Sequence, residues 1–138
     1  MLEHDCNAWI AKAISDLRSA KKLLKDDDKT LDTAAYHTQQ CVEKTLKAFL
    51  VFNKQLPPKT HDLSKILEVC CAFDYSLKFM LNDIITLIPY AIHSRYPDDY
   101  FVICRDDVNK ALKIAQNTIK IIISKMDFYD QMTIFDIS

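Results

Sequence analysis

The chain of 138 residues contains no glycine, and this absence is the strongest constraint on its fold. At average usage a chain of this length would hold roughly ten glycines. Because glycine is the residue that adopts positive φ angles without a steric penalty, we expect the backbone to lie almost wholly at negative φ, with helices joined by Pro, Asp and Asn turns. The composition therefore favours helices and disfavours the tight hairpins that depend on Asn-Gly or Asp-Gly.

The same absence excludes several classes of site. A phosphate-binding P-loop and a G-x-G-x-x-G dinucleotide loop both need glycine, because the backbone must turn tightly and approach the phosphate closely. The G-x-S-x-G elbow of α/β hydrolases is excluded for the same reason. Any nucleotide site in this chain therefore has to be formed by side chains.

The length of 138 residues predicts one domain of ordinary size. The net charge of −1 argues against a strongly basic coat, although it does not exclude a local basic groove. The N-terminus is too polar for a signal peptide, and no apolar run approaches the length of a membrane span. Together with thiols that we expect to be reduced, these features predict a cytoplasmic protein without a membrane association. The cysteines are Cys6, Cys41, Cys70, Cys71 and Cys104.

Apolar residues recur at helical spacing along most of the chain. We expect an all-α fold, an up-and-down four-helix-type bundle with one additional short helix. Thr60 is expected to cap the short helix and Asp74 or Ser76 the next one, which Pro89 would kink or end. The bundle domain would span residues 1–127, with a tail, 128–138, that is either disordered or docked. The expected helices span residues 5–25, 31–53, 61–73, 75–90 and 106–126.

Metal and thiol chemistry find little support in the sequence. Di-metal bundles use Glu-x-x-His pairs, and none of Glu3, Glu43 and Glu68 has a histidine three residues later. We therefore expect no metal and no cofactor. Cys41 lies on an apolar line in the middle of the second helix, where a buried core thiol is the expected role.

The second expected helix carries the densest polar pattern. The spacing of His37, Gln40 and Lys44 places them on one face, and Tyr36 lies beside them. Three kinds of hydrogen-bonding group on one stripe suggest a binding face. The simpler alternative is a solvent-exposed face with an ion pair between Glu43 and Lys47.

Two further segments hold candidate ligands. His61 lies at the expected start of the short helix, where capping by Thr60 and Asp62 explains its neighbours but not the histidine itself. Arg95 lies in a loop and could clamp a phosphate or carboxylate with two hydrogen bonds. An ion pair from Arg95 to Asp98 or Asp99 is an equally good explanation of that loop.

Taken together, these segments resemble the HEPN domain family, named for its occurrence in higher eukaryotes and prokaryotes. The matching features, from residue 8 to residue 126, are Trp9, ISDLRSAKKLL (14–24), AAYHTQQCVEKTLKAFL (34–50), KTHDL (59–63) and SRYPDD (94–99). The resemblance implies a helical bundle that is commonly a homodimer. It also implies a toxin–antitoxin type of system in which the partner is a minimal nucleotidyltransferase.

Some members of that family are metal-independent RNases with an Arg-x4–6-His motif, and this chain departs from the motif. Tyr100 stands five residues after Arg95, and no histidine follows either Arg95 or Arg105. With a pKa near 10, tyrosine is a poor proton shuttle at neutral pH. The weak catalytic candidates are therefore Arg95 with His93, or with His37, and we expect that an enzyme is the less favoured interpretation.

The sequence thus favours a module that binds a nucleotide or another phosphate ligand, with a second copy of itself as partner and with RNA as a further candidate ligand. Cationic side chains would hold the phosphate, and Tyr36 or Tyr96 would stack on a base. The alternatives are a divergent RNase and a purely structural dimerisation domain. The expected ligand-binding residues are Tyr36, His37, Gln40, Lys44, His61, Arg95 and Tyr96.

Overall fold

The computed structural model describes residues 4–25, 27–93 and 102–126, and these residues form no strand. The predicted all-α fold is confirmed. Three long helices, α1 (Cys6–Lys25), α2 (Leu31–Phe52) and α6 (Arg105–Met126), form the body. The shorter segments are the 3-10 helices η2 (Asp28–Thr30) and η3 (Tyr75–Met80) and the helices α3 (Leu63–Cys71), α4 (Leu81–Ile85) and α5 (Ile88–His93).

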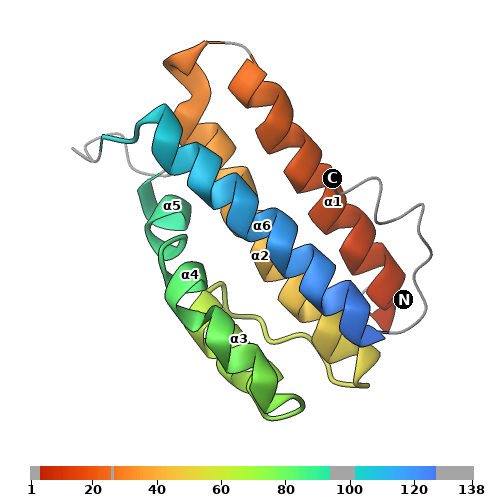
Figure 1. Cartoon of the computed structure of the whole chain (residues 1–138). Coiled ribbons are helices and arrows are strands. Elements are labelled where there is room, and N and C mark those ends of the chain that lie inside the picture. Colours follow the sequence, from red (N-terminus) through yellow and green to blue (C-terminus); the bar gives the residue numbers. More distant parts are fainter. Residues whose placement is uncertain (1–3, 26, 94–101, 127–138) are drawn as a thin grey trace.

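The arrangement places α2 at the centre of the bundle. It contacts α1, α3, α5 and α6, and in Figure 1 it lies behind α6. Helix α1 lies along one side of this pair, and the short segments from α3 to α5 cover the other side. Because α2 has neighbours on most sides, it buries far more of its surface than an ordinary outer helix does.

The outer helices each bury a single apolar stripe. In α1 the buried residues follow the helical period, with Leu17 and Ala20 fully enclosed and Lys12, Arg18 and Lys22 exposed on the other side. In α6 the buried line is Val108, Ala111, Ala115, Ile119, Ile122 and Met126. The three consecutive isoleucines at 121–123 therefore lie within a helix, as the longer pattern predicts.

Helix α2 is buried almost all round in its second half. From residue 41 to residue 51, every residue is buried except Lys44. The buried set includes three polar residues, Glu43, Thr45 and Lys47. The Thr45 hydroxyl donates to the Cys41 carbonyl within the helix. The buried charges of Glu43 and Lys47 therefore remain, and they need partners inside the bundle.

Aspartates cap the two starts that follow the central loop. The Asp62 carboxylate accepts a 3.0 Å hydrogen bond from the Ser64 amide, so Asp62, not Thr60, is the N-cap of α3. The Thr60 hydroxyl instead accepts from the Asp62 amide at 3.1 Å and braces the cap. Asp74 caps η3 through the Ser76 amide, as expected for one of its two candidates.

The fourth expected helix is not continuous. Residues 75–93 form η3, α4 and α5 in place of one helix over 75–90. Pro89 is the second residue of α5 and has no amide hydrogen to bond to the preceding turn, so the chain restarts there. Just before it, Thr86 and Leu87 donate to the carbonyls three residues back, those of Asp83 and Ile84.

All five cysteines are free thiols, with Cys41 and Cys70 buried and Cys104 exposed. Among the described residues, no helix has the length and apolar character needed to cross a bilayer. The expected tail, 128–138, lies outside the described residues.

Candidate functional site

A buried carboxylate in α1 joins two of the predicted ligands. Lys44 Nζ donates to Asp16 Oδ2 at 2.6 Å, and His37 Nδ1 lies 2.8 Å from Asp16 Oδ1. The Asp16 side chain is 11% exposed, whereas His37 and Lys44 are 28% and 25% exposed. The Asp16 carboxylate therefore contacts the Lys44 ammonium and the His37 imidazole from the interior side, while both side chains stay partly exposed.

This geometry leaves binding capacity at the surface. A lysine ammonium has three donors and Asp16 takes one of them. The His37 ring contacts Asp16 through Nδ1, so Nε2 is the nitrogen left for another partner. Tyr36 lies edge-on to this imidazole, with ring centroids 5.9 Å apart, and its ring helps to fix the histidine.

A second buried carboxylate, Glu43, joins α2 to the central loop. Lys47 Nζ donates to Glu43 Oε2 at 3.2 Å, and His61 Nδ1 lies 3.1 Å from both oxygens of the same carboxylate. The side chains of Glu43 and Lys47 are 4% and 6% exposed, and that of His61 is 60% exposed. His61 is thus held at the start of α3 by a group from the bundle core, which helix capping alone does not explain.

The ion pair between Glu43 and Lys47, which belonged to the simpler alternative, does form, but both of its side chains are buried. Trp9 of α1 covers the lysine, with Nζ 5.8 Å from the ring centroid. Glu43 and Lys47 are buried because α2 lies at the centre of the bundle. A helix on the outside of the bundle would expose one face to solvent. The alternative of a simple solvent-exposed stripe is therefore wrong at these two positions.

The two clusters adjoin because Glu43 and Lys44 are consecutive in α2 and because α1 supplies Asp16 to one and Trp9 to the other. We call this region the α1–α2 seam, defined by Trp9, Asp16, His37, Glu43, Lys44, Lys47 and His61. Gln40 lies beside it, and its amide nitrogen donates to the Gln39 side chain at 2.7 Å. Gln39 is fully buried, and its Nε2 has no acceptor among the described residues.

The candidate ligands expected after α5 cannot be placed relative to the α1–α2 seam. Arg95 and Tyr96, together with Asp98, Asp99 and Tyr100, lie outside the described residues. The backbone of His93 ends α5, but its side chain is also outside the description. The structure therefore joins His37 and Lys44 through Asp16, and it places His61 on Glu43, the neighbour of Lys44 in α2. The roles of Arg95 and Tyr96 stay predictions.

Asp16 is the residue that the sequence interpretation missed. It stands between Ile14 and Leu17, in the buried stripe of α1, where an acid is out of place unless it is paired. That single polar residue within an apolar line was the available signal. Glu43, between Val42 and Leu46, carries the same signal and was interpreted only as a surface ion pair.

The buried thiols are unsuited to catalysis. Burial, with the nearby Asp16 carboxylate, raises the pKa of the Cys41 thiol far above its ordinary range. Burial likewise raises the pKa of Cys70 to about 12. At neutral pH both remain protonated and therefore poorly nucleophilic. Among the described residues, no group of three or more His, Cys, Asp or Glu side chains is placed to hold a metal ion.

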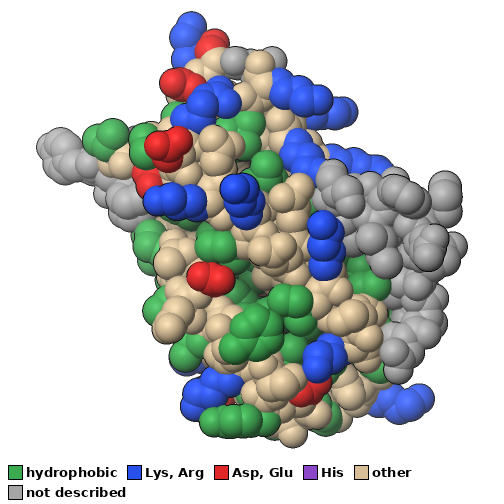
Figure 2. All heavy atoms as spheres, viewed as in Figure 1, with side chains coloured by type: hydrophobic (Ala, Val, Ile, Leu, Met, Phe, Trp, Pro, Cys, Tyr) green, Lys and Arg blue, Asp and Glu red, His purple; other side chains and the backbone are tan. Residues whose placement is uncertain are grey.

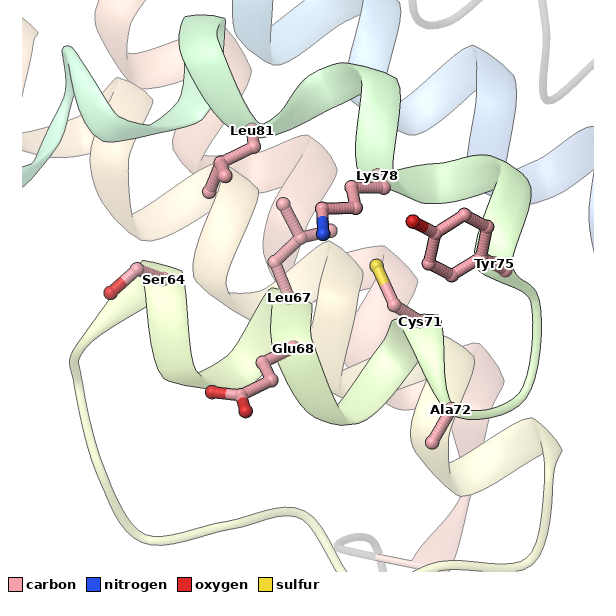
Figure 3. A pocket seen from close by; sticks show the side chains of 8 residues that line it. All are labelled: Ser64, Leu67, Glu68, Cys71, Ala72, Tyr75, Lys78 and Leu81. Carbon is pink, nitrogen blue, oxygen red and sulfur yellow. The ribbon is translucent and has the colours of Figure 1, made fainter.

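Away from the seam, a groove of about 530 Å³ lies between α3 and the η3–α4 segment. Figure 3 shows the Lys78 ammonium and the Cys71 sulfur directed into the space between these segments. Lys78 Nζ lies 5.5 Å from the centroid of the Tyr75 ring, so the amine is engaged at the groove wall. The lining residues are Ser64, Leu67, Glu68, Cys71, Ala72, Tyr75, Lys78 and Leu81, and none was a predicted ligand.

Comparison with known proteins agrees with this helical architecture. The family model described as "HEPN domain" matches residues 6–126. The chain belongs to the HEPN domain family. It is 29% identical to the protein named "Putative toxin MJ1304" from Methanocaldococcus jannaschii, over 83% of each chain. The crystal structure of ST0689, described as an archaeal HEPN homologue, superposes with a TM-score of 0.69 at 22% identity. That superposition covers 89% of this chain and 98% of the other, and it shows that the fold is shared.

Proposed function

We propose that this HEPN protein is the toxin-like member of a toxin–antitoxin type of pair and that it binds a phosphate-bearing ligand, such as a nucleotide, at the α1–α2 seam. The similarity to a protein named as a toxin supports the first part. The second part is supported by the geometry of Lys44. The chain has no glycine to build a backbone phosphate cradle, so the ligand has to be held by side chains.

Lys44 is the observation that carries the proposal. Between residues 41 and 51 it is the one side chain of α2 that reaches the surface. The buried Asp16 carboxylate holds the Lys44 ammonium through a 2.6 Å hydrogen bond. Because the lysine is already ordered, it loses less conformational entropy on binding an anion than a free lysine would. The remaining donors of the ammonium are then available to a phosphate oxygen.

The two histidines extend the same arrangement. His37 and His61 both direct Nδ1 to a buried carboxylate, Asp16 and Glu43 respectively, and this fixes the orientation of each ring. When protonated, each Nε2 can donate to a phosphate oxygen. Arg95 and Tyr96 belong to the proposal as contributors expected from the sequence, with the arginine on the phosphate and the tyrosine on a base.

The proposed partners are a second copy of the chain and a minimal nucleotidyltransferase of antitoxin type. Size-exclusion chromatography with light scattering tests the first, since a homodimer has twice the 16.0 kDa mass of the chain. A purely structural dimerisation domain would also give that mass. The ligand experiment separates the two functions, because only the proposed function needs Lys44.

Thermal unfolding in the presence of nucleotides tests the site. With ligand at ten times its dissociation constant, binding adds about 1.4 kcal/mol of stability, which raises Tm by several degrees in a domain of this size. We expect ATP, AMP or inorganic phosphate at 10 mM to give such a shift. Lys44→Gln should abolish it, whereas Lys12→Gln, which removes an exposed charge elsewhere on the surface, should leave it intact.

Lys44→Gln also removes a partner of Asp16, so its own Tm has to be compared with and without ligand. Lys44→Arg, which keeps the charge, should retain part of the shift. The proposal is wrong if no nucleotide or phosphate changes the Tm of the unmodified protein at 10 mM. It is equally wrong if Lys44→Gln responds as the unmodified protein does.

A further inference from the structure

The 3-10 geometry of η3 aligns three side chains along one wall of a groove. A 3-10 helix has three residues per turn, so side chains three residues apart lie one above another. Tyr75, Lys78 and Leu81 have this spacing and all line the groove, whereas Leu77 and Met80 turn into the bundle. In a regular α-helix, which the sequence predicted here, each step of three residues would rotate the side chain by about 60°. The irregular segment therefore forms a straighter wall than that helix would.

Helix α3 forms the opposite wall. Leu67 and Cys71 lie one turn apart on it and face the η3–α4 segment across the groove. We call this space of about 530 Å³ the α3–η3 groove, and its size lies within the range of roughly 300–1,000 Å³ found for small-molecule sites. Figure 2 shows hydrophobic side chains gathered over the part of the molecule where η3 and α4 lie in Figure 1, and Tyr75 and Phe79 are exposed there.

Polar atoms meet at one end of the α3–η3 groove. Figure 3 shows the Lys78 ammonium, the Tyr75 hydroxyl and the Cys71 sulfur directed into the space between the walls. Burial raises the pKa of the Cys71 thiol, and the positive charge of Lys78 acts in the opposite direction, as expected for an ammonium close to the sulfur.

The Lys78 charge is not neutralised by the protein. Within the part of the chain that the structure describes, this ammonium has no hydrogen bond and no ion pair; it contacts the face of the Tyr75 ring, which uses none of its donors. Glu68, the acid that lines the groove, is directed away from Lys78 in Figure 3. Asp74 is occupied by Lys125 at 2.9 Å and by the amide at the start of η3. An uncompensated cation thus stands in a largely apolar groove.

We propose that the α3–η3 groove binds a small amphiphilic carboxylate, a molecule with one carboxylate head and an apolar body such as a medium-chain fatty acid, at a surface separate from the α1–α2 seam. The carboxylate accepts hydrogen bonds from the Lys78 ammonium and the Tyr75 hydroxyl. The apolar body lies between Leu67 and Leu81, where both the ligand and the groove lose contact with water.

The chemistry of the groove favours this class over two others. A phosphate monoester carries nearly two negative charges at pH 7, whereas the groove offers one ammonium and has Glu68 at its rim, which suits a single charge. An uncharged apolar segment of a partner protein would cover Lys78 without supplying a counter-charge, and removal of an unpaired charge from water is unfavourable. A carboxylate with an apolar body satisfies both the ammonium and the walls.

Isothermal titration calorimetry of the full chain with hexanoate, octanoate and decanoate tests the proposal. We expect a dissociation constant of about 1 mM or lower for decanoate, the affinity of a ligand of this size at ordinary efficiency. Each added methylene should strengthen binding by about threefold while the groove has room for it. Acetate lacks the apolar body and octan-1-ol lacks the charge, so both should bind about fivefold or more weakly than octanoate.

A matched pair of variants assigns the charge. Lys78→Met keeps the apolar stem of the lysine and removes the ammonium, so it should weaken octanoate binding by about fivefold or more and leave octan-1-ol binding unchanged. Lys65→Met removes an exposed ammonium from α3 outside the groove and should change neither. Lys78→Arg, which keeps a cation, should retain part of the affinity. Circular dichroism verifies that the variants are folded, and Lys78→Gln replaces Lys78→Met if that variant is not.

The reactivity of Cys71 locates the ligand. Because its sulfur is directed into the α3–η3 groove, saturating decanoate should slow its modification by a disulfide reagent several-fold. Cys104, which is exposed and lies outside the groove, should react at the same rate with and without decanoate. Mass spectrometry after short exposure measures both thiols in one sample.

Four results would overturn the proposal. The first is the absence of binding by decanoate at 10 mM. The second is octan-1-ol binding as tight as that of octanoate, which would show that apolar contact alone is recognised, as in docking of an apolar protein segment. The third is equal weakening by Lys65→Met and Lys78→Met, and the fourth is an unchanged rate for Cys71. Lys44→Gln should leave octanoate binding intact, so failure here is distinct from failure of the nucleotide site.

Discussion

Lys47 and Glu43 form a 3.2 Å ion pair inside the bundle, one helical turn apart in α2, and both side chains are buried. Trp9 lies over the ammonium, and His61 lies on the carboxylate. Neither charge has access to bulk water. Each therefore depends on the other, and the loop before α3 is held to the core through the same carboxylate.

We expect Lys47→Met to destabilise the protein by about 3–5 kcal/mol, because it leaves the Glu43 carboxylate buried without its cation. Urea unfolding followed by circular dichroism measures this change. The double variant Glu43→Leu/Lys47→Met should recover much of the loss, since two apolar groups replace the pair. A loss below about 1 kcal/mol for Lys47→Met would contradict the burial of the pair.

Arg105 is expected to fasten the start of α6 to the end of α1. Its Nη1 donates to the Leu24 carbonyl at 2.6 Å, and its Nε donates to Asp28 at 3.0 Å. Arg105→Ala should cost about 1–2 kcal/mol, because the terminal carbonyl of α1 loses a charged donor. Asp28→Asn should cost much less, since Asp28 is exposed. Equal losses would assign the stabilisation to the ion pair.

Asp62 should contribute an acid-sensitive part of the stability. Its hydrogen bond from the Ser64 side chain, with backbone bonds from Ser64 and Lys65, holds the pKa of its carboxyl below the ordinary 3.8. A lowered folded pKa means that the contribution is complete above about pH 4 and is lost as pH falls through the folded value.

Two substitutions separate this charge from the cap itself. Asp62→Ala should cost about 1 kcal/mol at pH 7, because the helix loses its N-cap. Asp62→Asn keeps a capping oxygen and should lose less stability between pH 5 and pH 3 than the unmodified chain does. Urea midpoints at several pH values measure both. An unchanged pH profile in Asp62→Asn would remove Asp62 from the acid response.

The thiols should react in the order of their burial. Cys104 is exposed, and its thiol donates to Asp107 at 3.1 Å, while Cys41 and Cys70 are enclosed and their raised pKa values disfavour the thiolate. At pH 8 we expect a disulfide reagent to modify Cys104 first, and Cys41 and Cys70 only after unfolding. Mass spectrometry after short exposure identifies the modified residues. Modification of Cys41 in the folded protein would contradict its burial.

The helices were predictable where one apolar stripe decides the structure. In α1 and α6 the stripe repeats over twenty residues or more, and the observed bounds, Cys6–Lys25 and Arg105–Met126, differ from the expected ones by a single residue at the start. Over residues 75–90 the stripe also suits a helix, but the missing amide hydrogen of Pro89 separates α4 from α5, and residues 75–80 form the 3-10 helix η3. Local backbone chemistry therefore decided what the apolar spacing alone could not.

The site was only half predictable. Spacing in α2 grouped His37 with Lys44, and the structure joins them, but through Asp16, which lies 21 and 28 residues away in the chain. Contacts of that range depend on how α1 packs on α2. The burial of Glu43 and Lys47 likewise follows from neighbours on several sides of α2, which no pattern within one helix reveals.

The chain leaves α2 through Lys54, two residues after the end of the helix, in a conformation that suits glycine. Among the described residues, Lys54 is the one with a positive φ, 64°. A side chain in that left-handed conformation costs about 1–2 kcal/mol, which glycine would avoid. Lys54 is exposed and lies beyond the last turn of α2, so its side chain displaces no residue of the core. The turn that a glycine would ordinarily make is thus taken by a strained lysine, and it is placed at an exposed position outside the packed core.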